Sequence, residues 1–142
     1  MATVGCPRNC AEATVKDIGL VGQEGGWQVV VGGAAGKSVR KADLLITVET
    51  TEAALEAAEL FFQYYREQAN YLERTYDFVE RFGIAQLKQI LIDDSEGICA
   101  ALDAAVQTAV DAFADPWLEG NTPIHPLQFH THAGSISAEP IA

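Results

Sequence analysis

The sequence predicts an α+β fold, with a small glycine-rich β-sheet at the amino end followed by a helical body. Two observations predict it. Up to Val48 the apolar residues form short, β-branched runs between glycines, whereas after Thr50 apolar residues recur at helical spacing. The 142 residues, 49% of them hydrophobic, are enough for one compact domain with a core of its own.

The glycine-rich head is expected to contain three strands. Residues 18–22 and the run that starts at Trp27 flank the turn QEGG, and this pattern predicts a β-hairpin. The run 44–48 is apolar and partly β-branched, which predicts a third strand or the start of a helix. A short helical stretch is expected at 11–17, before the hairpin, and the segment 32–41 is expected to be a loop.

The first helix of the body is the best-defined element. Thr50 or Thr51 can cap it, and Glu52 lies in its first turn, where the helix dipole favours negative charge. The apolar residues step by three and four, and are expected to form the buried face: Leu55, Ala58, Phe62, Tyr65, Ala69 and Leu72.

Two further helical segments follow. The first covers 76–91 with a break at Gly83. The second is expected to be capped by Ser95 and to end at Asp115-Pro116. Its apolar stripe is Cys99, Leu102, Val106 and Phe113.

The net charge of −11 is unevenly distributed. Residues 1–50 hold five basic and five acidic residues, so the entire acidic excess lies in 51–142. Nucleic acid is bound through clustered Lys and Arg, so this charge excludes it as a partner. No apolar run reaches the roughly 20 residues of a membrane span, and no signal peptide is visible. A cytoplasmic protein is therefore expected.

Cys6 and Cys10 form a C-x3-C pair and are the candidate metal ligands. Thiolate sulfur is a soft ligand that favours zinc, copper(I) or iron-sulfur clusters. A site built only from thiolates needs four of them, so spacing alone leaves open that these are unpaired structural thiols. Cys99 falls on the apolar face of a predicted helix and is expected to act as a small hydrophobe.

The segment GGAAGKSVRK is a candidate anion-binding loop. It is not a nucleotide-binding P-loop, because that motif needs a glycine where Val31 stands. Its glycines allow close backbone approach and its cations can pair with an anion. The residues concerned are Gly32, Gly33, Gly36, Lys37, Arg40 and Lys41. A glycine turn with solvated basic side chains is the alternative.

The tail, residues 120–142, is expected to be irregular because Pro, Gly, Ser and Thr accumulate there. His125, His130 and His132 lie in it without carboxylate or cysteine support and are expected to be surface residues. No arrangement of nucleophile and base indicates a catalytic residue.

Two segments carry a family likeness: GCPRNCAEATVKDIGLVG and, after the strand at Trp27, VGGAAGKSVRKADLL. They resemble the siroheme and 4Fe-4S half-domain of the nitrite and sulfite reductases, above all that of the large subunit of assimilatory NAD(P)H nitrite reductases. The likeness continues through FFQYYREQANYLERTYDFVERFGI and, less specifically, to DPWLE. It therefore covers residues 1–119, as the C-terminal part of that domain.

In that family two cysteine pairs, C-x5-C and C-x3-C, bind the cluster. Cys6 and Cys10 match the second pair, and Cys10 matches the thiolate shared with the siroheme iron. The first pair would lie upstream of Met1, so the resemblance implies a piece of a longer enzyme. Siroheme carries eight carboxylates, and the resemblance implies that Arg8 and the candidate anion-binding loop hold some of them.

The resemblance implies an enzyme that reduces nitrite to ammonia in nitrate assimilation, with electrons from NAD(P)H through FAD on upstream domains. The implied partners are the rest of the enzyme and a small nitrite reductase subunit, and homo-oligomers stay open. The isolated chain is expected to be inactive. The alternatives are part of an assimilatory sulfite reductase, a non-catalytic module in which two chains share a metal, and a helical interaction domain.

Overall fold

The computed structural model describes residues 1–115. Residues Met1–Thr108 form one compact unit, which holds the sheet and most of the helical residues, and Ala109–Ala142 form another. The expected boundary at residue 119 and the three histidines of the tail lie outside the described residues. Within the described part no helix is long and apolar enough to span a membrane.

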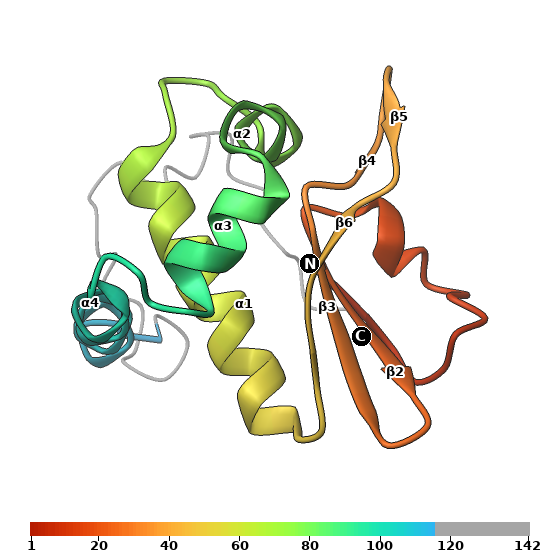
Figure 1. Cartoon of the computed structure of the whole chain (residues 1–142), viewed down its shortest axis with the longest axis horizontal. Helices are drawn as coiled ribbons and strands as arrows, with labels where there is room; N and C mark the ends of the chain where they lie inside the picture. The colour runs from red at the N-terminus through yellow and green to blue at the C-terminus, as the bar shows by residue number, and fades with distance from the viewer. Residues whose placement is uncertain (116–142) are drawn as a thin grey trace, which may run out of the picture. The chain divides into compact units, whose positions relative to one another are not determined.

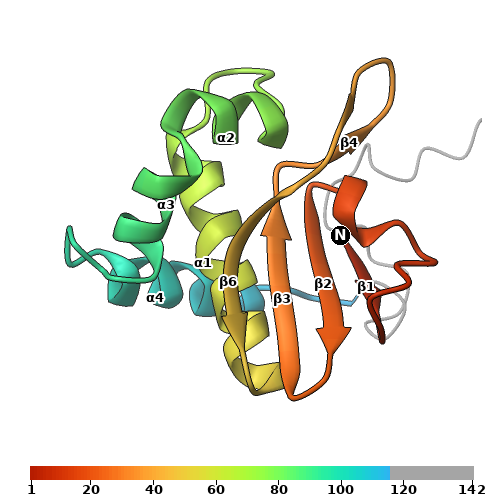
Figure 2. The same cartoon turned by 45° about the vertical axis from the view of Figure 1, so that its right-hand side comes forward.

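A four-stranded mixed sheet in the order β1-β2-β3-β6 forms one layer of the first unit (Figure 2). The predicted hairpin is confirmed as β2 (Ile18–Gln23) paired with β3 (Gly26–Val31), and β3 also pairs with β6 (Asp43–Val48), the expected third strand. Strand β1 (Ala2–Val4) was not predicted, and it pairs in parallel with β2. Three residues of which only Val4 is buried are too short a run to show the period of a strand.

The expected loop at 32–41 is itself a small hairpin. Strand β4 (Ala34–Ala35) pairs antiparallel with β5 (Val39–Arg40), and this β4–β5 hairpin projects past the end of the main sheet (Figure 1). Two residues per strand give no periodicity that a sequence pattern can detect. The expectation of an irregular loop was therefore wrong for these residues.

Within residues 1–115 four helices follow, and α1 to α3 pack on one face of the sheet (Figure 1). They are α1 (Thr51–Gln68), α2 (Thr75–Phe82), α3 (Ile84–Leu91) and α4 (Cys99–Asp111). Thr50 is the cap of α1, since its hydroxyl accepts a hydrogen bond from the Ala53 N–H at 3.2 Å, and Gly83 separates α2 from α3 as predicted. The α+β prediction is thus confirmed.

Two local predictions need correction. The stretch at 11–17 forms only one 3-10 turn, η1 (Ala13–Val15). Ser95 does not cap α4, because that helix begins four residues later and the carboxylate of Asp94 accepts the hydrogen bond from the Cys99 N–H at 3.1 Å.

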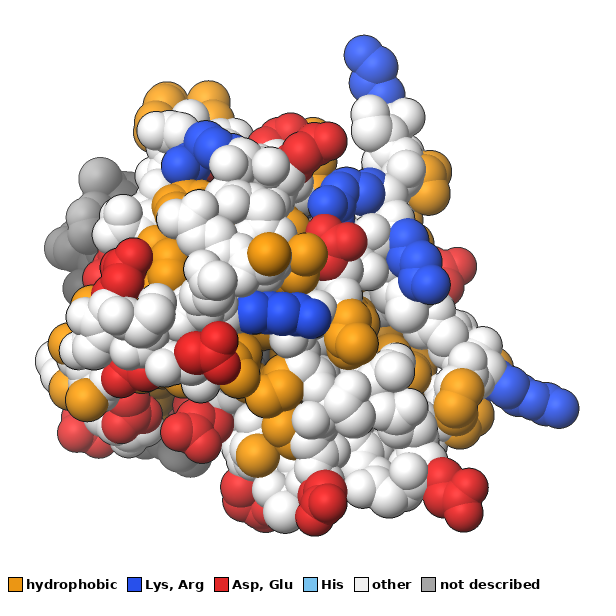
Figure 3. Space-filling model, in the orientation of Figure 1, with side chains coloured by type: hydrophobic (Ala, Val, Ile, Leu, Met, Phe, Trp, Pro, Cys, Tyr) orange, Lys and Arg blue, Asp and Glu red, His pale blue; other side chains and the backbone are white. Residues whose placement is uncertain are grey.

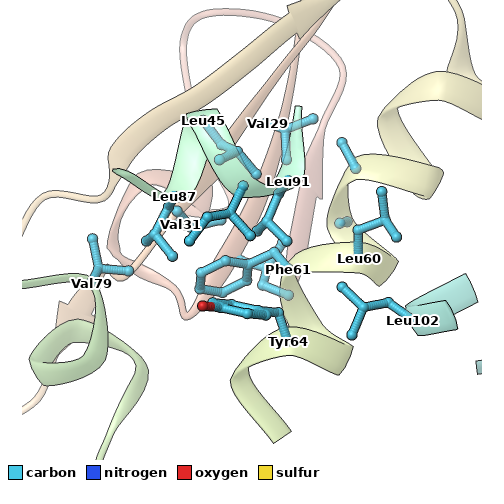
Figure 4. Close-up of a cluster of buried hydrophobic side chains, with 14 of the residues drawn as sticks. Val29, Val31, Leu45, Leu60, Phe61, Tyr64, Val79, Leu87, Leu91 and Leu102 are labelled. Atoms are coloured by element: carbon cyan, nitrogen blue, oxygen red, sulfur yellow. The ribbon is translucent and has the colours of Figure 1, made fainter. Parts of the chain in front are cut away.

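The main core lies between the sheet and the helices (Figure 4). Side chains from β3 and β6 meet those of α1, α2 and α3 there, and Phe61 and Phe78 are the largest fully buried residues. The ring of Phe78 contacts four other rings: Phe61, Tyr64, Tyr65 and Phe82. This aromatic cluster fixes α1 against α2.

The predicted buried face of α1 was partly wrong. Leu55 and Phe62 are 40% and 50% exposed, and Leu72 lies beyond the end of the helix. The face against the sheet is instead formed by Ala54, Ala57, Ala58, Phe61 and Tyr64. Helix α1 carries two neighbouring apolar stripes, and periodicity alone cannot choose between them. The small alanines decide it, because they let the helix axis approach β3 closely.

Candidate metal centre and anion-binding loop

The cysteine loop, residues 5–12, leaves the sheet after β1 and returns through η1 to β2. Cys6 and Cys10 are both exposed in it. Backbone turns shape the loop: the Asn9 N–H donates to the Cys6 carbonyl at 3.2 Å and the Glu12 N–H to the Asn9 carbonyl at 2.9 Å. Both sulfurs are therefore presented to solvent by a folded segment.

Asn9 is a loop-forming residue that the sequence analysis did not single out. It has φ 55°, in the left-handed region that Asn tolerates better than most residues. Its side-chain amide donates to the Thr14 hydroxyl at 2.7 Å, which ties the loop to η1. The signal that could have found it is an Asn between two cysteines, directly before the second.

Close packing under the loop requires glycine in β2. A Cβ at Gly19 would lie 2.2 Å from the Ala13 carbonyl oxygen, and one at Gly22 would lie 2.8 Å from the Gly5 carbonyl oxygen. Val4, Ala13 and Val21 form a small second core on this side of the sheet. The cysteine loop is thus seated on the sheet face that the helices leave open.

The β4–β5 hairpin and its flanks hold the candidate anion-binding residues. Arg40 has partners within the protein: its guanidinium donates to the Gly32 carbonyl at 2.7 Å and pairs with the Asp43 carboxylate at 2.7 Å. Lys37 and Lys41 are exposed, as is Arg8 in the cysteine loop. Figure 3 shows basic side chains along this hairpin and acidic ones over the helical side.

Two of the glycines have a packing reason in this fold. Gly32 has φ +74°, and a Cβ there would lie 2.7 Å from a methyl group of Val79 on α2. A Cβ at Gly33 would lie 2.6 Å from the Lys16 carbonyl oxygen. At Gly36, near the tip of the hairpin, a Cβ would meet nothing within 4 Å. Gly32 and Gly33 therefore seat the base of the hairpin, and Gly36 is not constrained by the fold.

The structure brings the cysteine loop and part of the basic segment to one cavity on the open sheet face. The cavity measures about 560 Å³. Pro7, Asn9 and Thr14 line it from the cysteine side, and Lys41, Ala42 and Asp43 from the other. Its floor includes Val21 and Val30, whose side chains point away from the helices. Arg8 and Lys37 are not among its lining residues.

Cys99 lies elsewhere, as predicted. It packs against the main core, and its Sγ lies 3.5 and 3.6 Å from the carbonyl oxygens of Ile90 and Leu91. Burial, together with the neighbouring Asp94 carboxylate, raises the pKa of the Cys99 thiol to about 11. Within residues 1–115 no group of three or more Cys, His, Asp or Glu side chains is arranged to hold a metal ion. The cysteine loop itself offers two thiols, whereas a site built only from thiolates needs four.

Comparison with known proteins identifies the family of the chain. The family model described as "Nitrite and sulphite reductase 4Fe-4S domain" matches residues 1–98. The chain belongs to that family. It is 44% identical over 117 residues to a nitrite reductase [NAD(P)H] of Bacillus subtilis, which covers 82% of this chain and 14% of that protein.

Two other relatives are a nitrite reductase and a sulfite reductase. A nitrite reductase (NADH) large subunit of Escherichia coli is 34% identical over 139 residues, 96% of this chain and 16% of that protein. An assimilatory-type sulfite reductase of Nitratidesulfovibrio vulgaris is 35% identical over 88 residues, 62% of this chain and 40% of that protein. The chain thus spans about a seventh of the length of the nitrite reductases that it matches.

Proposed function

We propose that this chain is the C-terminal part of the siroheme and 4Fe-4S domain of an NAD(P)H nitrite reductase. One observation carries the proposal: the loop that holds the two exposed thiols borders, through Pro7 and Asn9, the same cavity as Lys41, on the sheet face that the helices do not cover. The family match supports it. In the whole enzyme, Cys6 and Cys10 would help hold a cluster that, with the siroheme, passes to nitrite the six electrons that NAD(P)H supplies for its conversion to ammonia.

Cys6 and Cys10 are proposed to hold two corners of the cluster, with Cys10 shared with the siroheme iron. The hydrogen bonds of Asn9 fix the loop between them before any metal arrives, which lowers the entropy lost on binding. Backbone N–H groups near the sulfurs would tune the reduction potential of the cluster. The other two thiolates would come from residues outside this chain.

The cations are proposed to neutralise carboxylates of the siroheme. Lys41 is the best placed, because it lines the cavity beside the cysteine loop. Lys37 and Arg8 are exposed cations that can reach a large ligand from the hairpin tip and the loop. The ion pair of Arg40 with Asp43 holds the hairpin in place, and its remaining N–H groups can still serve a carboxylate. Gly32, Gly33 and Gly36 let the backbone approach the ligand.

The whole enzyme would also need FAD and NAD(P)H. The domains that bind them are proposed to lie outside the matched segment. Electrons would pass from NAD(P)H through FAD to the cluster. A small nitrite reductase subunit is a proposed partner of the complete polypeptide. The short chain on its own is expected to be inactive.

The decisive experiment replaces cysteines one at a time in the full-length polypeptide. Cys6→Ser and Cys10→Ser should each abolish the visible absorbance and the electron paramagnetic resonance signal of the cluster. Cys99→Ser is the matched control and should keep both, since that thiol is packed against the core. A Cys10→Ser protein with normal cluster content would contradict the proposal.

A second experiment tests the cations. Lys41→Ala should lower the siroheme content of the purified enzyme while leaving its fold intact, because the side chain is exposed. Lys88→Ala, on α3 at the opposite face of the sheet, serves as the control. Equal siroheme content in the two variants would remove Lys41 from the site.

Reconstitution of the isolated chain with iron and sulfide under anaerobic conditions tests the half-site. No stable cluster is expected, because the chain offers two of the four thiolates. One stable cluster per monomer would contradict this. About one cluster per two chains would instead favour the module in which two copies share a metal.

A sulfite reductase is the second candidate function, favoured by the 35% identity to an assimilatory-type sulfite reductase. Both activities use the same cofactors, so the cavity described above serves either one. Steady-state rates of the full-length enzyme with nitrite and with sulfite, each with the same reductant, would separate them.

A further inference from the structure

The helical side of the first unit contains an apolar groove that the proposed cofactor site does not use. It measures about 510 Å³ and is lined from four elements, by Leu55 and Phe62 of α1, Thr75 of α2, Val106 of α4 and Ile18 of β2 among others. Leu55 and Phe62 belong to the second apolar stripe of α1, the one predicted to be buried. Met1, which is 70% exposed, also lines the groove.

The two apolar stripes give α1 the character of a helix packed on both sides. One stripe faces the sheet and is fully covered, whereas the other leaves half of Phe62 in water. The side of a surface helix that faces away from the core is normally polar, so large apolar side chains left half in water on that side are unusual. We therefore infer that the stripe around Phe62 is a contact surface that no residue among 1–115 fully covers.

The polar atoms of the groove do not form a small-molecule site. The Asp17 carboxylate accepts hydrogen bonds from the side chains of Thr75 and Arg74, and the Tyr65 hydroxyl donates to the Glu73 carbonyl. Small ligands are held by a few convergent polar groups that still have hydrogen bonds to offer. Here the side chain of Glu59 alone lines the groove without a partner among residues 1–115.

A helix fits the groove better than a strand does. The walls are side chains of helices and of strand ends, and an added strand would leave its backbone N–H and C=O groups without partners there. A helix satisfies its own backbone and needs only apolar side chains. A basic residue on its edge would face Glu59.

We propose that the groove is the docking site for an apolar helix from the part of the longer polypeptide outside these 142 residues. The inference rests on the proposed function, in which the chain is one segment of a nitrite reductase. The relatives are about six to seven times as long as the matched segment, since it covers 14% and 16% of them. A covalently attached helix has a high effective concentration at the groove, so a modest apolar contact is enough to keep it bound.

Hydroxyl-radical footprinting compares the isolated chain with the full-length polypeptide encoded by the gene. In the isolated chain Phe62 and Leu55 should be oxidised readily, as should Tyr71, which is 94% exposed and lies outside the groove. In the full-length protein the oxidation of Phe62 and Leu55 should fall several-fold while that of Tyr71 changes little. Equal oxidation of Phe62 in the two proteins would overturn the inference.

A second copy of the chain is the competing occupant. It predicts protection of Phe62 in the isolated chain, increasing with protein concentration, and that outcome would also overturn the inference. A pair of variants completes the test. Phe62→Glu in the full-length polypeptide should make the neighbouring α1 peptide accessible to oxidation again, whereas Tyr71→Glu should not.

Cluster content measured on the same full-length samples separates this inference from the proposed function. A normal cluster with an accessible groove would overturn the inference and leave the function standing. A protected groove in a protein that binds no cluster under anaerobic reconstitution would support the inference and contradict the proposed function.

Discussion

The thiol of Cys99 should react far more slowly than an exposed cysteine in the folded chain. Its pKa is raised from 9.0 to about 11, first by burial and then by the Asp94 carboxylate. The thiolate is the reactive form, so a rise of about two units lowers its population at pH 8 about 100-fold. Packing against the core adds a steric barrier to this factor.

The assay follows modification by a chromogenic disulfide reagent at pH 8, with peptide mass spectrometry to identify each thiol. The exposed Cys6 and Cys10 should account for a fast phase of two equivalents. Cys99 should form a separate phase at least about 100-fold slower than that of an ordinary exposed cysteine. In denaturant the three thiols should react alike, because burial is lost.

Two controls sharpen the result. Cys99→Ser should remove the slow phase alone, and Asp94→Asn should speed it up, because the neighbouring negative charge opposes formation of the thiolate. A Cys99 that reacts within about tenfold of an exposed cysteine in the native chain would refute the reasoning. It would also contradict the expectation that Cys99 acts as a small hydrophobe.

Three further predictions concern stability. The pKa of Glu73 is lowered from 4.5 to about 2, chiefly by the hydrogen bond from Arg81. The ionised carboxylate therefore stabilises the fold fully above pH 4.5, and this stabilisation is lost as the pH falls towards 2. In Glu73→Gln, the urea-unfolding midpoint should fall less steeply between pH 6 and pH 2. Phe78→Ala should cost about 3–5 kcal/mol in urea denaturation, because the ring is fully buried. Gly19→Ala should cost about 1–3 kcal/mol or more, because the added methyl meets the Ala13 carbonyl oxygen, and the shift of η1 should speed backbone hydrogen exchange in the cysteine loop.

Each of these variants has a matched control in the chain. Glu80→Gln removes an exposed carboxylate from α2 and is the control for Glu73→Gln. Tyr71→Ala, at an exposed position, should shift the free energy of unfolding by less than about 0.5 kcal/mol. Gly36→Ala places a methyl where nothing lies within 4 Å and should be neutral. If Phe78→Ala were as mild as Tyr71→Ala, or Gly19→Ala as mild as Gly36→Ala, the packing described here would be wrong.

The candidate site was predictable in its residue types but not in its layout. A C-x3-C pair and a segment of glycines and cations mark chemistry through residue identity, which is present in the sequence. The cavity that Pro7 and Asn9 of the cysteine loop share with Lys41 depends on the pairing of β2 with both β1 and β3, and on the close approach of Gly19 to Ala13. The ion pair that engages Arg40 depends likewise on the turn that brings Asp43 back beside it.

The sequence by itself determined the α+β class, the hairpin of β2 and β3, where α1 begins, and that the acidic excess lies in the helical half while the head has no net charge. Those features follow from contacts between residues near one another in the chain, such as the Thr50 cap. Only the tertiary structure decided which stripe of α1 is covered, because Ala54 and Phe62 lie on apolar stripes of one helix that differ only in what packs against them. The tertiary structure also shows that Leu55 and Phe62 on the other stripe stay partly exposed among the described residues.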